Sequence, residues 1–320
     1  MKPRALPVTR HINLCYKKGH RTVSRLCSHD LNIKNFFDLD LIIRSNSKKF
    51  LNLISRYYGM FLLPDMQEYY RRNFRLREGV CIDIFFDNRR TDDFLEALFV
   101  LERRIKYDFF WGRFIILHGS CVRYNNFNIF FLGMATSGKS TMCSALREKG
   151  GKVLSEDLSF LEKDTGDAYM FPSIGNIRPG IKIGIQEKYL KSIRERYVGT
   201  FLTKEMISMK KKDYDSLLSY HKALYGVDKS LLKDEHGKNT NLFILLKKDR
   251  KQGKGGILLH KKGIEVLPEL MQNVASNYQH YSKLVKESMS IFLKSECYVL
   301  HRAPLDLMIS EVCNRFNIKI

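Results

Sequence analysis

The segment at residues 133–140, GMATSGKS, matches the pattern G-x4-G-K-[ST] in full and constrains the fold more than any other feature of the chain. In such a loop, glycines let backbone N–H groups turn inward around phosphate oxygens, and the start of the next helix adds positive potential. An apolar strand at 129–132 leads into the segment, and an amphipathic helix at 139–148 follows it. This context predicts a phosphate-binding loop within an α/β domain.

The loop predicts a nucleoside triphosphate as ligand, ATP in our interpretation, together with Mg²⁺. Lys139 would bridge the β- and γ-phosphate oxygens, and the hydroxyl of Ser140 would hold Mg²⁺. A second glycine–lysine stretch at 251–256 lacks the G-K-[ST] ending and a following helix, so we interpret it as a hairpin turn. The residues predicted to bind the nucleotide are Gly133, Met134, Ala135, Thr136, Ser137, Gly138, Lys139, Ser140 and Thr141.

Two acidic residues, Glu156 and Asp157, follow an apolar strand predicted at 152–155. A right-handed crossover through the helix makes this strand parallel to the strand at 129–132, so both end at the same edge of the sheet. The carboxylates therefore arrive beside the phosphate loop. Phosphoryl transfer to an alcohol needs a carboxylate near Mg²⁺ and a base near the acceptor, and this pair is the candidate for both.

His118 lies on a strand predicted at 114–122, and the strand after it leads into the phosphate loop. A histidine within an apolar strand is often an ordinary core residue. The alternative is that His118 contacts a phosphate or the acidic pair, because its strand neighbours the loop. The sequence leaves these two interpretations open.

The remaining pattern divides the chain into two predicted parts. Residues 1–90 alternate short apolar runs with polar breaks and predict a small α+β lobe. Residues 91–320 predict the phosphate-loop domain, with a polar, Lys-rich insertion at about 185–240. Further strands are predicted at 39–43, 80–86, 158–162, 242–246 and 297–300, and further helices at 48–58, 94–105, 266–274, 278–293 and 305–316.

The chain carries 55 Lys and Arg against 34 Asp and Glu, a formal net charge of +21. Such a charge favours polyanionic partners, and a solvated Lys-rich surface is an equal interpretation. The excess is spread along the whole chain and marks no nucleic-acid arm, so nucleic acid is the less favoured partner. The sequence shows no apolar leader and no run of 18 uncharged apolar residues. We therefore predict a cytoplasmic protein without a membrane span.

The seven cysteines have no repeated spacing and do not predict a disulfide framework. Four potential metal ligands, Cys15, His20, Cys27 and His29, lie close together near the start of the chain. Their spacing, C-x4-H-x6-C-x-H, is not that of a known zinc ribbon or finger. We predict ordinary core and surface residues here rather than a zinc site.

The order of these features resembles the catalytic domain of HPr kinase/phosphorylase and the broader family of HPr-kinase-like proteins. That family shows a strand with a His and a small residue, a turn, a hydrophobic strand into G-x4-G-K-[ST], a short helix, and a strand that ends in paired acids. The similarity is specific over about 110–183 and looser to the chain end. It implies a P-loop kinase domain with a mixed β-sheet flanked by helices. It also implies that Glu156 takes the acceptor's proton and that Asp157 lies near the metal with Ser140.

Two features differ from the bifunctional members of that family. The first acid is Glu rather than Asp, and no R-G-L-G-I segment follows the acids. The resemblance therefore points to relatives outside that branch, which include kinases that phosphorylate a serine on a small precursor peptide. It implies an ATP-dependent kinase that transfers the γ-phosphoryl group to a hydroxyl of a peptide or protein.

Other functions stay open at this point. The basic charge is compatible with a kinase that acts on a small molecule or on a nucleic-acid end. A switch or scaffold that binds ATP without turnover would carry the same loop. Lys210, Lys211 and Lys212 in the insertion would border the groove for an acidic acceptor, with a plain solvated face as the alternative. The sequence also leaves homo-oligomerisation open.

Overall fold

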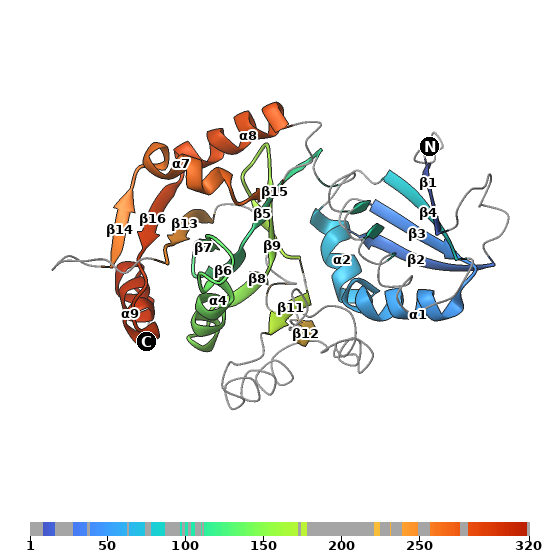
Figure 1. Cartoon of the computed structure of the whole chain (residues 1–320), viewed down its shortest axis with the longest axis horizontal. Helices are drawn as coiled ribbons and strands as arrows, with labels where there is room; N and C mark the ends of the chain where they lie inside the picture. The colour runs from blue at the N-terminus through green and yellow to red at the C-terminus, as the bar shows by residue number, and fades with distance from the viewer. Residues whose placement is uncertain are drawn as a thin grey trace. The chain divides into compact units, whose positions relative to one another are not determined.

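A computed structural model of the chain (Figure 1) describes residues 9–16, 28–36, 39–62, 64–73, 78–86, 97, 100–101, 104–105, 110, 112–171, 174–177, 221–224, 231, 239–248, 257–275 and 281–318. The chain divides into two compact units, Met1–Phe109 and Phe110–Ile320. The division falls later than the predicted boundary at residue 90. The buried helical residues Ala97, Leu101 and Ile105 consequently belong to the first unit.

The first unit contains a four-stranded sheet in the order β1-β4-β3-β2. β4 pairs in parallel with β1 and β3, and β2 pairs antiparallel with β3. The strands predicted at 39–43 and 80–86 and the helix predicted at 48–58 are confirmed. The elements are β1 (Thr9–Tyr16), β2 (His29–Phe36), β3 (Leu39–Ser45), α1 (Lys48–Tyr57), the 3-10 helix η1 (Gly59–Leu62), α2 (Pro64–Asn73) and β4 (Glu78–Phe86).

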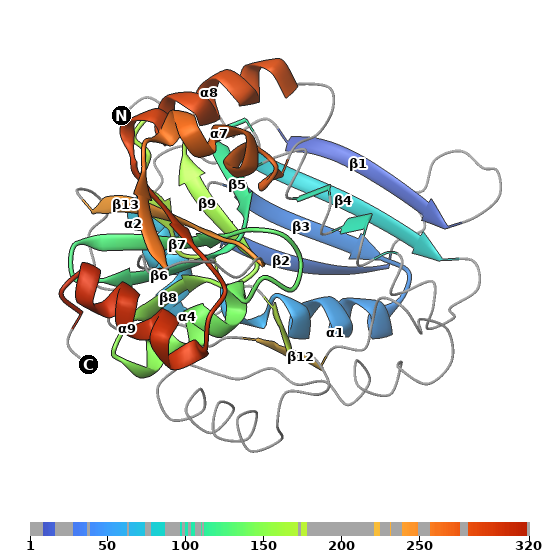
Figure 2. The ribbon, with the colours of Figure 1, turned by 60° about the vertical axis from the view of Figure 1, so that its left-hand side comes forward.

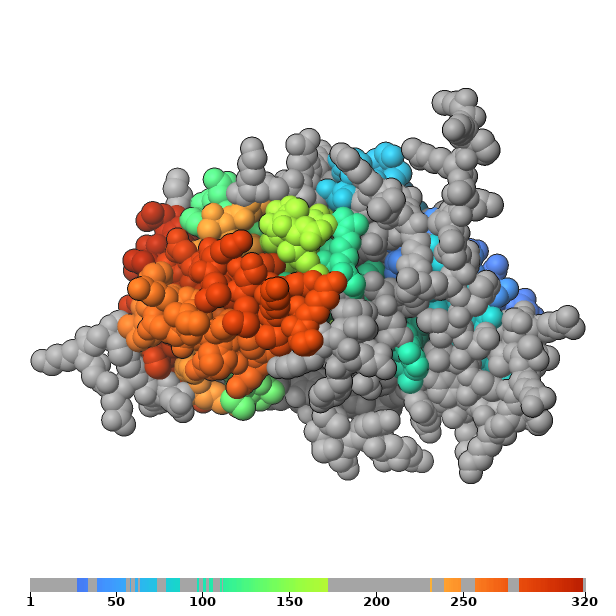
Figure 3. Space-filling model, turned by 90° about the horizontal axis from the view of Figure 1, so that it is seen from above, coloured from blue at the N-terminus to red at the C-terminus, as the bar shows by residue number. Residues whose placement is uncertain are grey.

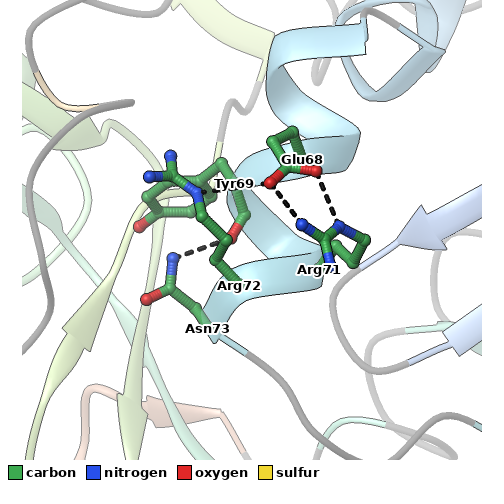
Figure 4. Close-up of polar contacts among 5 residues, drawn as sticks. All are labelled: Glu68, Tyr69, Arg71, Arg72 and Asn73. Carbon is green, nitrogen blue, oxygen red and sulfur yellow. Dashed lines mark hydrogen bonds and ion pairs between the residues drawn. The ribbon is translucent and has the colours of Figure 1, made fainter.

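Ion pairs join two strands of this unit and lie along one of its helices. Arg44 on β3 pairs with the buried Asp83 on β4 at 2.7 Å, which supplies a partner for a carboxylate taken out of water. On α2, Glu68 pairs with Arg71 at 2.6 Å and with Arg72 at 3.7 Å (Figure 4). These α2 pairs are exposed to solvent, so they contribute little to the stability of the fold. They support the helix and mark no site.

The second unit contains a six-stranded sheet, β14-β16-β13-β7-β6-β8, and a four-stranded sheet, β10-β9-β5-β15 (Figure 2). The protein is therefore mixed α/β with several sheets. The elements of this unit are β5 (Phe114–His118), β6 (Ser120–Tyr124), β7 (Phe127–Leu132), α4 (Lys139–Glu148), β8 (Lys152–Ser155), β9 (Leu158–Glu162), β10 (Ala168–Tyr169), β11 (Ile174–Ile177), β12 (His221–Leu224), β13 (Thr240–Leu246), β14 (Leu258–Lys261), α7 (Gly263–Met271), β15 (Val274–Ala275), α8 (Tyr281–Lys294), β16 (Glu296–Leu300) and α9 (Leu305–Arg315).

In the six-stranded sheet, β7 pairs in parallel with β13, and β13 pairs in parallel with β16. β6 is antiparallel to both β7 and β8. β8 therefore runs in the direction predicted for it, parallel to β7, but β6 lies between them. The three strands β7, β13 and β16 end at one edge of the sheet, which we call the carboxyl edge, and β8 ends at this edge too.

Helices cover both faces of the six-stranded sheet (Figures 1 and 2). α4 and α9 pack on one face, where Met142 of α4 and Val312 of α9 share a core with Ile244 of β13. On the other face, Phe292 of α8 meets Phe243 of β13 with the ring centroids 5.0 Å apart. α7 and α8 lie side by side on the surface of this unit (Figure 3). The core on both faces holds the strand that carries the phosphate loop.

The glycine pair at 150–151 ends α4 as a helix C-cap requires. Gly150 has a φ of +94°, which favours glycine, and its N–H donates to the carbonyl of Arg147. Gly151 donates to the carbonyl of Leu146, and a Cβ on it would lie 2.6 Å from Val122. This tight ending leads the chain directly from α4 into β8.

Most other predicted elements of the second unit are confirmed, including the strands at 158–162, 242–246 and 297–300. β9 forms a hairpin with β10. Most of the predicted insertion at 185–240, with Lys210, Lys211 and Lys212, lies outside the described residues. So do the turn at 251–256 and His20 and Cys27 of the cysteine–histidine cluster. Of the insertion, β12 pairs antiparallel with β11. Within the described ranges, no helix is long and apolar enough to cross a membrane.

Candidate functional site

The phosphate loop connects β7 to α4, as the sequence predicts, and its backbone needs glycine at both ends. Gly133 has a φ of +137°, and a Cβ on it would lie 2.7 Å from the carbonyl oxygen of Leu246. Gly138 has a φ of +102° and caps α4 without a side chain. The N–H groups in the first turn of an α-helix such as α4 have no acceptor within the helix. The loop thus presents backbone donors and a helix start toward the carboxyl edge, a setting that favours an anion.

Lys139 folds back onto the phosphate loop. Its Nζ donates to the carbonyl oxygen of Gly133 at 2.6 Å and to that of Met134 at 3.1 Å. These bonds hold the ammonium group at the mouth of the loop rather than out in solvent. A phosphate in the loop would therefore meet a positioned positive charge, which makes the loop suited to a polyphosphate.

Asn273 anchors this loop, and sequence reasoning missed it. Its Oδ1 accepts the N–H of Gly133 at 2.9 Å, and its backbone carbonyl accepts the N–H of His118 at 2.7 Å. Asn273 is buried, and its Nδ2 donates to the carbonyl oxygen of Glu269 at 2.8 Å. One asparagine thus links the start of the phosphate loop to the histidine strand. No motif marks it, because it lies 140 positions from Gly133 in the sequence.

We expect Asn273→Ala to lower the free energy of unfolding by about 1–3 kcal/mol, because the buried N–H of Gly133 loses its acceptor. Denaturant unfolding of the full chain measures this. The exposed neighbour Gln272 gives a matched control, and Gln272→Ala should stay within about 0.5 kcal/mol of the wild type. Equal effects of the two substitutions would contradict the anchoring role.

The strand predicted at 114–122 is wrong as a single element, because it divides at Gly119. β5 belongs to the four-stranded sheet and β6 to the six-stranded sheet. A Cβ on Gly119 would lie 2.4 Å from Leu132 Cδ2 and 2.6 Å from the carbonyl oxygen of Phe131. The chain can therefore cross between the sheets here only with glycine. Because the strand ends at this crossing, His118 is the last residue of β5 and is exposed, rather than buried in the middle of an apolar strand.

A second crossing between the same two sheets lies next to the first. β8 of the six-stranded sheet passes through Glu156 and Asp157 into β9 of the four-stranded sheet. β9 pairs with β5, and β8 pairs with β6, so the two crossings face each other. The hydroxyl of Ser159 donates to the carbonyl oxygen of Gly119 at 2.9 Å and shares a 2.6 Å hydrogen bond with the hydroxyl of Ser155. These bonds fix the acidic pair beside His118.

We expect Gly119→Ala to destabilise the protein by about 1–3 kcal/mol, because the added methyl group overpacks the crossing. Gly112 is a matched control, since a Cβ on it would meet nothing within 4 Å. Gly112→Ala should change the free energy of unfolding by less than about 0.5 kcal/mol. Urea unfolding compares the two variants. If Gly119→Ala were as well tolerated as the control, the close approach would not limit this position.

The structure brings His118 and Asp157 together. His118 Nε2 lies 3.4 Å from Asp157 Oδ1, and the two side chains are 52% and 40% exposed. Of the two interpretations left open for His118, the structure therefore shows the one with a contact to the acidic pair. This exposed pair lies where β8 ends, on the edge toward which the phosphate loop opens.

Glu156 has a different environment from Asp157, since it is only 3% exposed. Its carboxylate lies close enough to the buried Cys143 of α4 to act on the thiol electrostatically. Burial raises the pKa of the Cys143 thiol far above its usual range, the charge of Glu156 raises that pKa further, and the charge of Arg147 lowers it. The two acids are adjacent in sequence, but their side chains have different surroundings. Glu156 is buried beside α4, and Asp157 is partly exposed to solvent.

The site can supply oxygen ligands for Mg²⁺. Mg²⁺ in nucleotide sites takes one or two protein groups and completes its shell with waters and phosphate oxygens. Ser140 in the first turn of α4 and the exposed Asp157 are a hydroxyl and a carboxylate of this kind. Among the described residues, no cluster of three or more His, Cys, Asp or Glu forms a complete metal cage.

All of the predicted site residues lie on two neighbouring features. The loop at 133–141 holds nine of them, and the paired crossings hold His118, Glu156 and Asp157. Both features belong to the second unit. The sequence matches no known protein family and no curated protein at a significant level.

Proposed function

We propose that the protein is an ATP-dependent kinase of the HPr-kinase-like type, which transfers the γ-phosphoryl group to a serine hydroxyl of a peptide or protein. One observation carries this proposal. A glycine-hinged loop with its lysine folded over it opens on the same sheet edge as an exposed Asp157–His118 pair. The first feature suits a triphosphate, and the second suits a hydroxyl that must lose its proton.

In this proposal the loop amides and Lys139 bind the phosphates and stabilise the charge that spreads over the γ-phosphoryl oxygens during transfer. Ser140 and Asp157 would hold Mg²⁺, which neutralises phosphate charge when it is bound. The acceptor oxygen forms a bond to the γ-phosphorus while the bond from that phosphorus to the β–γ bridging oxygen breaks. The products are a phosphorylated hydroxyl and ADP.

We assign the proton acceptor to Asp157 rather than to Glu156. The family resemblance gave this role to Glu156, but that side chain is buried against α4, away from an incoming hydroxyl. The carboxylate of Asp157 is accessible, and its Oδ1 lies beside His118. The carboxylate has two oxygens, so one can face the metal while the other takes the proton. Glu156 then serves as a positioning residue that ties the crossing to the phosphate-loop helix.

The acceptor class follows from charge and from the chemistry of transfer. The net charge of +21 favours an acidic peptide over a neutral metabolite. The resemblance to kinases of precursor peptides supports the same choice. We place the enzyme in the cytoplasm, in agreement with the buried free thiols of Cys81, Cys121, Cys143, Cys297 and Cys313.

Release of ADP in the presence of peptides tests this proposal. The protein is incubated with Mg·ATP and a pool of acidic peptides that contain serine, and the control pool carries alanine in place of serine. We expect the serine pool to stimulate ADP release and the alanine pool to leave it at the basal rate. Equal rates with both pools would refute a peptide kinase. Binding of ATP without any ADP release would indicate a switch protein instead.

A further inference from the structure

The carboxyl edge carries two exposed cations on the side of the phosphate loop away from the acidic pair. Lys248 follows β13, and Arg302 follows β16. Among the described residues, neither takes part in a hydrogen bond or an ion pair, whereas the adjacent Lys247 is tied to Glu269 at 2.8 Å. Ligands of parallel sheets bind at the carboxyl ends of the strands, and Lys248 and Arg302 lie at this edge. Neither side chain forms a hydrogen bond or an ion pair with another described residue.

The strand order fixes where these cations lie relative to the loop. Leu132 of β7 is in register with Leu245 of β13, and Leu246 of β13 with Leu300 of β16. Gly133 approaches the carbonyl of Leu246, and the N–H of Lys247 donates to the carbonyl of Leu300 at 3.0 Å. The sheet therefore presents, in sequence, the acidic pair, the phosphate loop, the end of β13 and the end of β16. With strands about 4.8 Å apart, β13 and β16 lie about 5 and 10 Å from β7.

This order gives a bound triphosphate a direction. The loop amides hold the middle of the phosphate chain, so the γ-phosphate and the α-phosphate leave the loop on opposite sides. Transfer requires the γ-phosphate on the side of Asp157 and His118. The α-phosphate and the nucleoside must then extend the other way, across the ends of β13 and β16.

We infer that the nucleoside of ATP lies over the ends of β13 and β16, where Arg302 stacks on the base and Lys248 lies by the ribose and α-phosphate. A guanidinium group is planar and stacks well on an aromatic base, which makes Arg302 suited to the position farther from the loop. The ammonium group of Lys248 is a compact charge and suits the nearer position. This inference rests on the proposed function, because it takes the γ-phosphate as the group that is transferred.

Binding of two ligands to the full-length protein tests the inference. Mg·ATP has a nucleoside, and Mg·tripolyphosphate has the same phosphate chain without one. We expect Arg302→Ala to raise the Kd for Mg·ATP by about tenfold and to change the Kd for Mg·tripolyphosphate by less than about twofold. Arg302→Lys should recover only part of the loss, because a lysine lacks the planar group.

Lys294 provides the matched control, because it is an exposed cation just before β16 and so lies at the opposite edge of the sheet. Lys294→Ala should leave both dissociation constants unchanged. Equal weakening of both ligands by Arg302→Ala would overturn the nucleoside contact, and so would no weakening of either. If the wild-type protein binds neither ligand, the phosphate site itself is refuted and this inference falls with it.

Discussion

Replacing Lys139 by alanine is expected to weaken binding of Mg·ATP by about 10²-fold or more. The ammonium group is held at the mouth of the loop by the carbonyl oxygens of Gly133 and Met134. It would give the phosphates charge-assisted hydrogen bonds, which are stronger than neutral ones and which alanine cannot replace. Calorimetric titration of Mg·ATP into the wild-type and variant proteins measures the change.

The fold of the Lys139→Ala variant should remain intact, because the two lost hydrogen bonds belong to a surface loop. We expect a loss of about 1 kcal/mol in the free energy of unfolding. Lys149 lies at the other end of the same helix and supplies the control. Lys149→Ala removes the same charge and should leave ATP affinity unchanged. An affinity of Lys139→Ala equal to that of the wild type would place the nucleotide elsewhere.

Replacing Asp157 by asparagine should lower phosphoryl transfer by about 10²–10⁴-fold, the usual contribution of a positioned acid–base group. Asparagine keeps the shape of the side chain but cannot accept the proton of the hydroxyl. The loop, Lys139 and Ser140 are untouched, so Mg·ATP should still bind, but more weakly, because one proposed Mg²⁺ ligand loses its charge. The rate of transfer at saturating Mg·ATP, measured under single-turnover conditions, isolates the chemical step from binding.

Glu156→Gln is the matched comparison, since it removes the neighbouring charge without a change of size. We expect it to lower the free energy of unfolding by about 1–3 kcal/mol, because Glu156 is buried and its interactions with the surrounding residues change when the charge is lost. It should slow transfer less than Asp157→Asn does. The opposite pattern, with transfer abolished in Glu156→Gln and retained in Asp157→Asn, would return the role of base to Glu156.

The features that the sequence predicted well are local in the chain. The loop, its strand and its helix follow each other within 22 residues, 127–148, and the helix bounds are as predicted. Gly133 and Gly138 have positive φ angles, so the conformation of the loop itself requires glycine at these two positions. A pattern whose physical cause lies within the same segment can be predicted from one sequence.

The features that the sequence could not predict depend on distant partners. The division at Gly119 arises because the chain from β7 passes against it, and an apolar run shows no sign of that approach. Asn273 reaches Gly133 only once α7 has packed. The opposite exposures of Glu156 and Asp157 also come from packing, since α4 covers one acid and not the other. Sequence reasoning found the acidic pair but could not assign its roles.

The most direct test of the proposed kinase follows the transferred atoms themselves. The protein is incubated with Mg²⁺, ATP labelled with ¹⁸O on the γ-phosphoryl group, and the pool of acidic serine peptides, and the products are analysed by mass spectrometry. We predict labelled phosphoserine in the peptides with the wild-type protein, and its loss with Lys139→Ala and with Asp157→Asn. Label found only in free phosphate, or labelled phosphoserine that persists in both variants, would contradict the account.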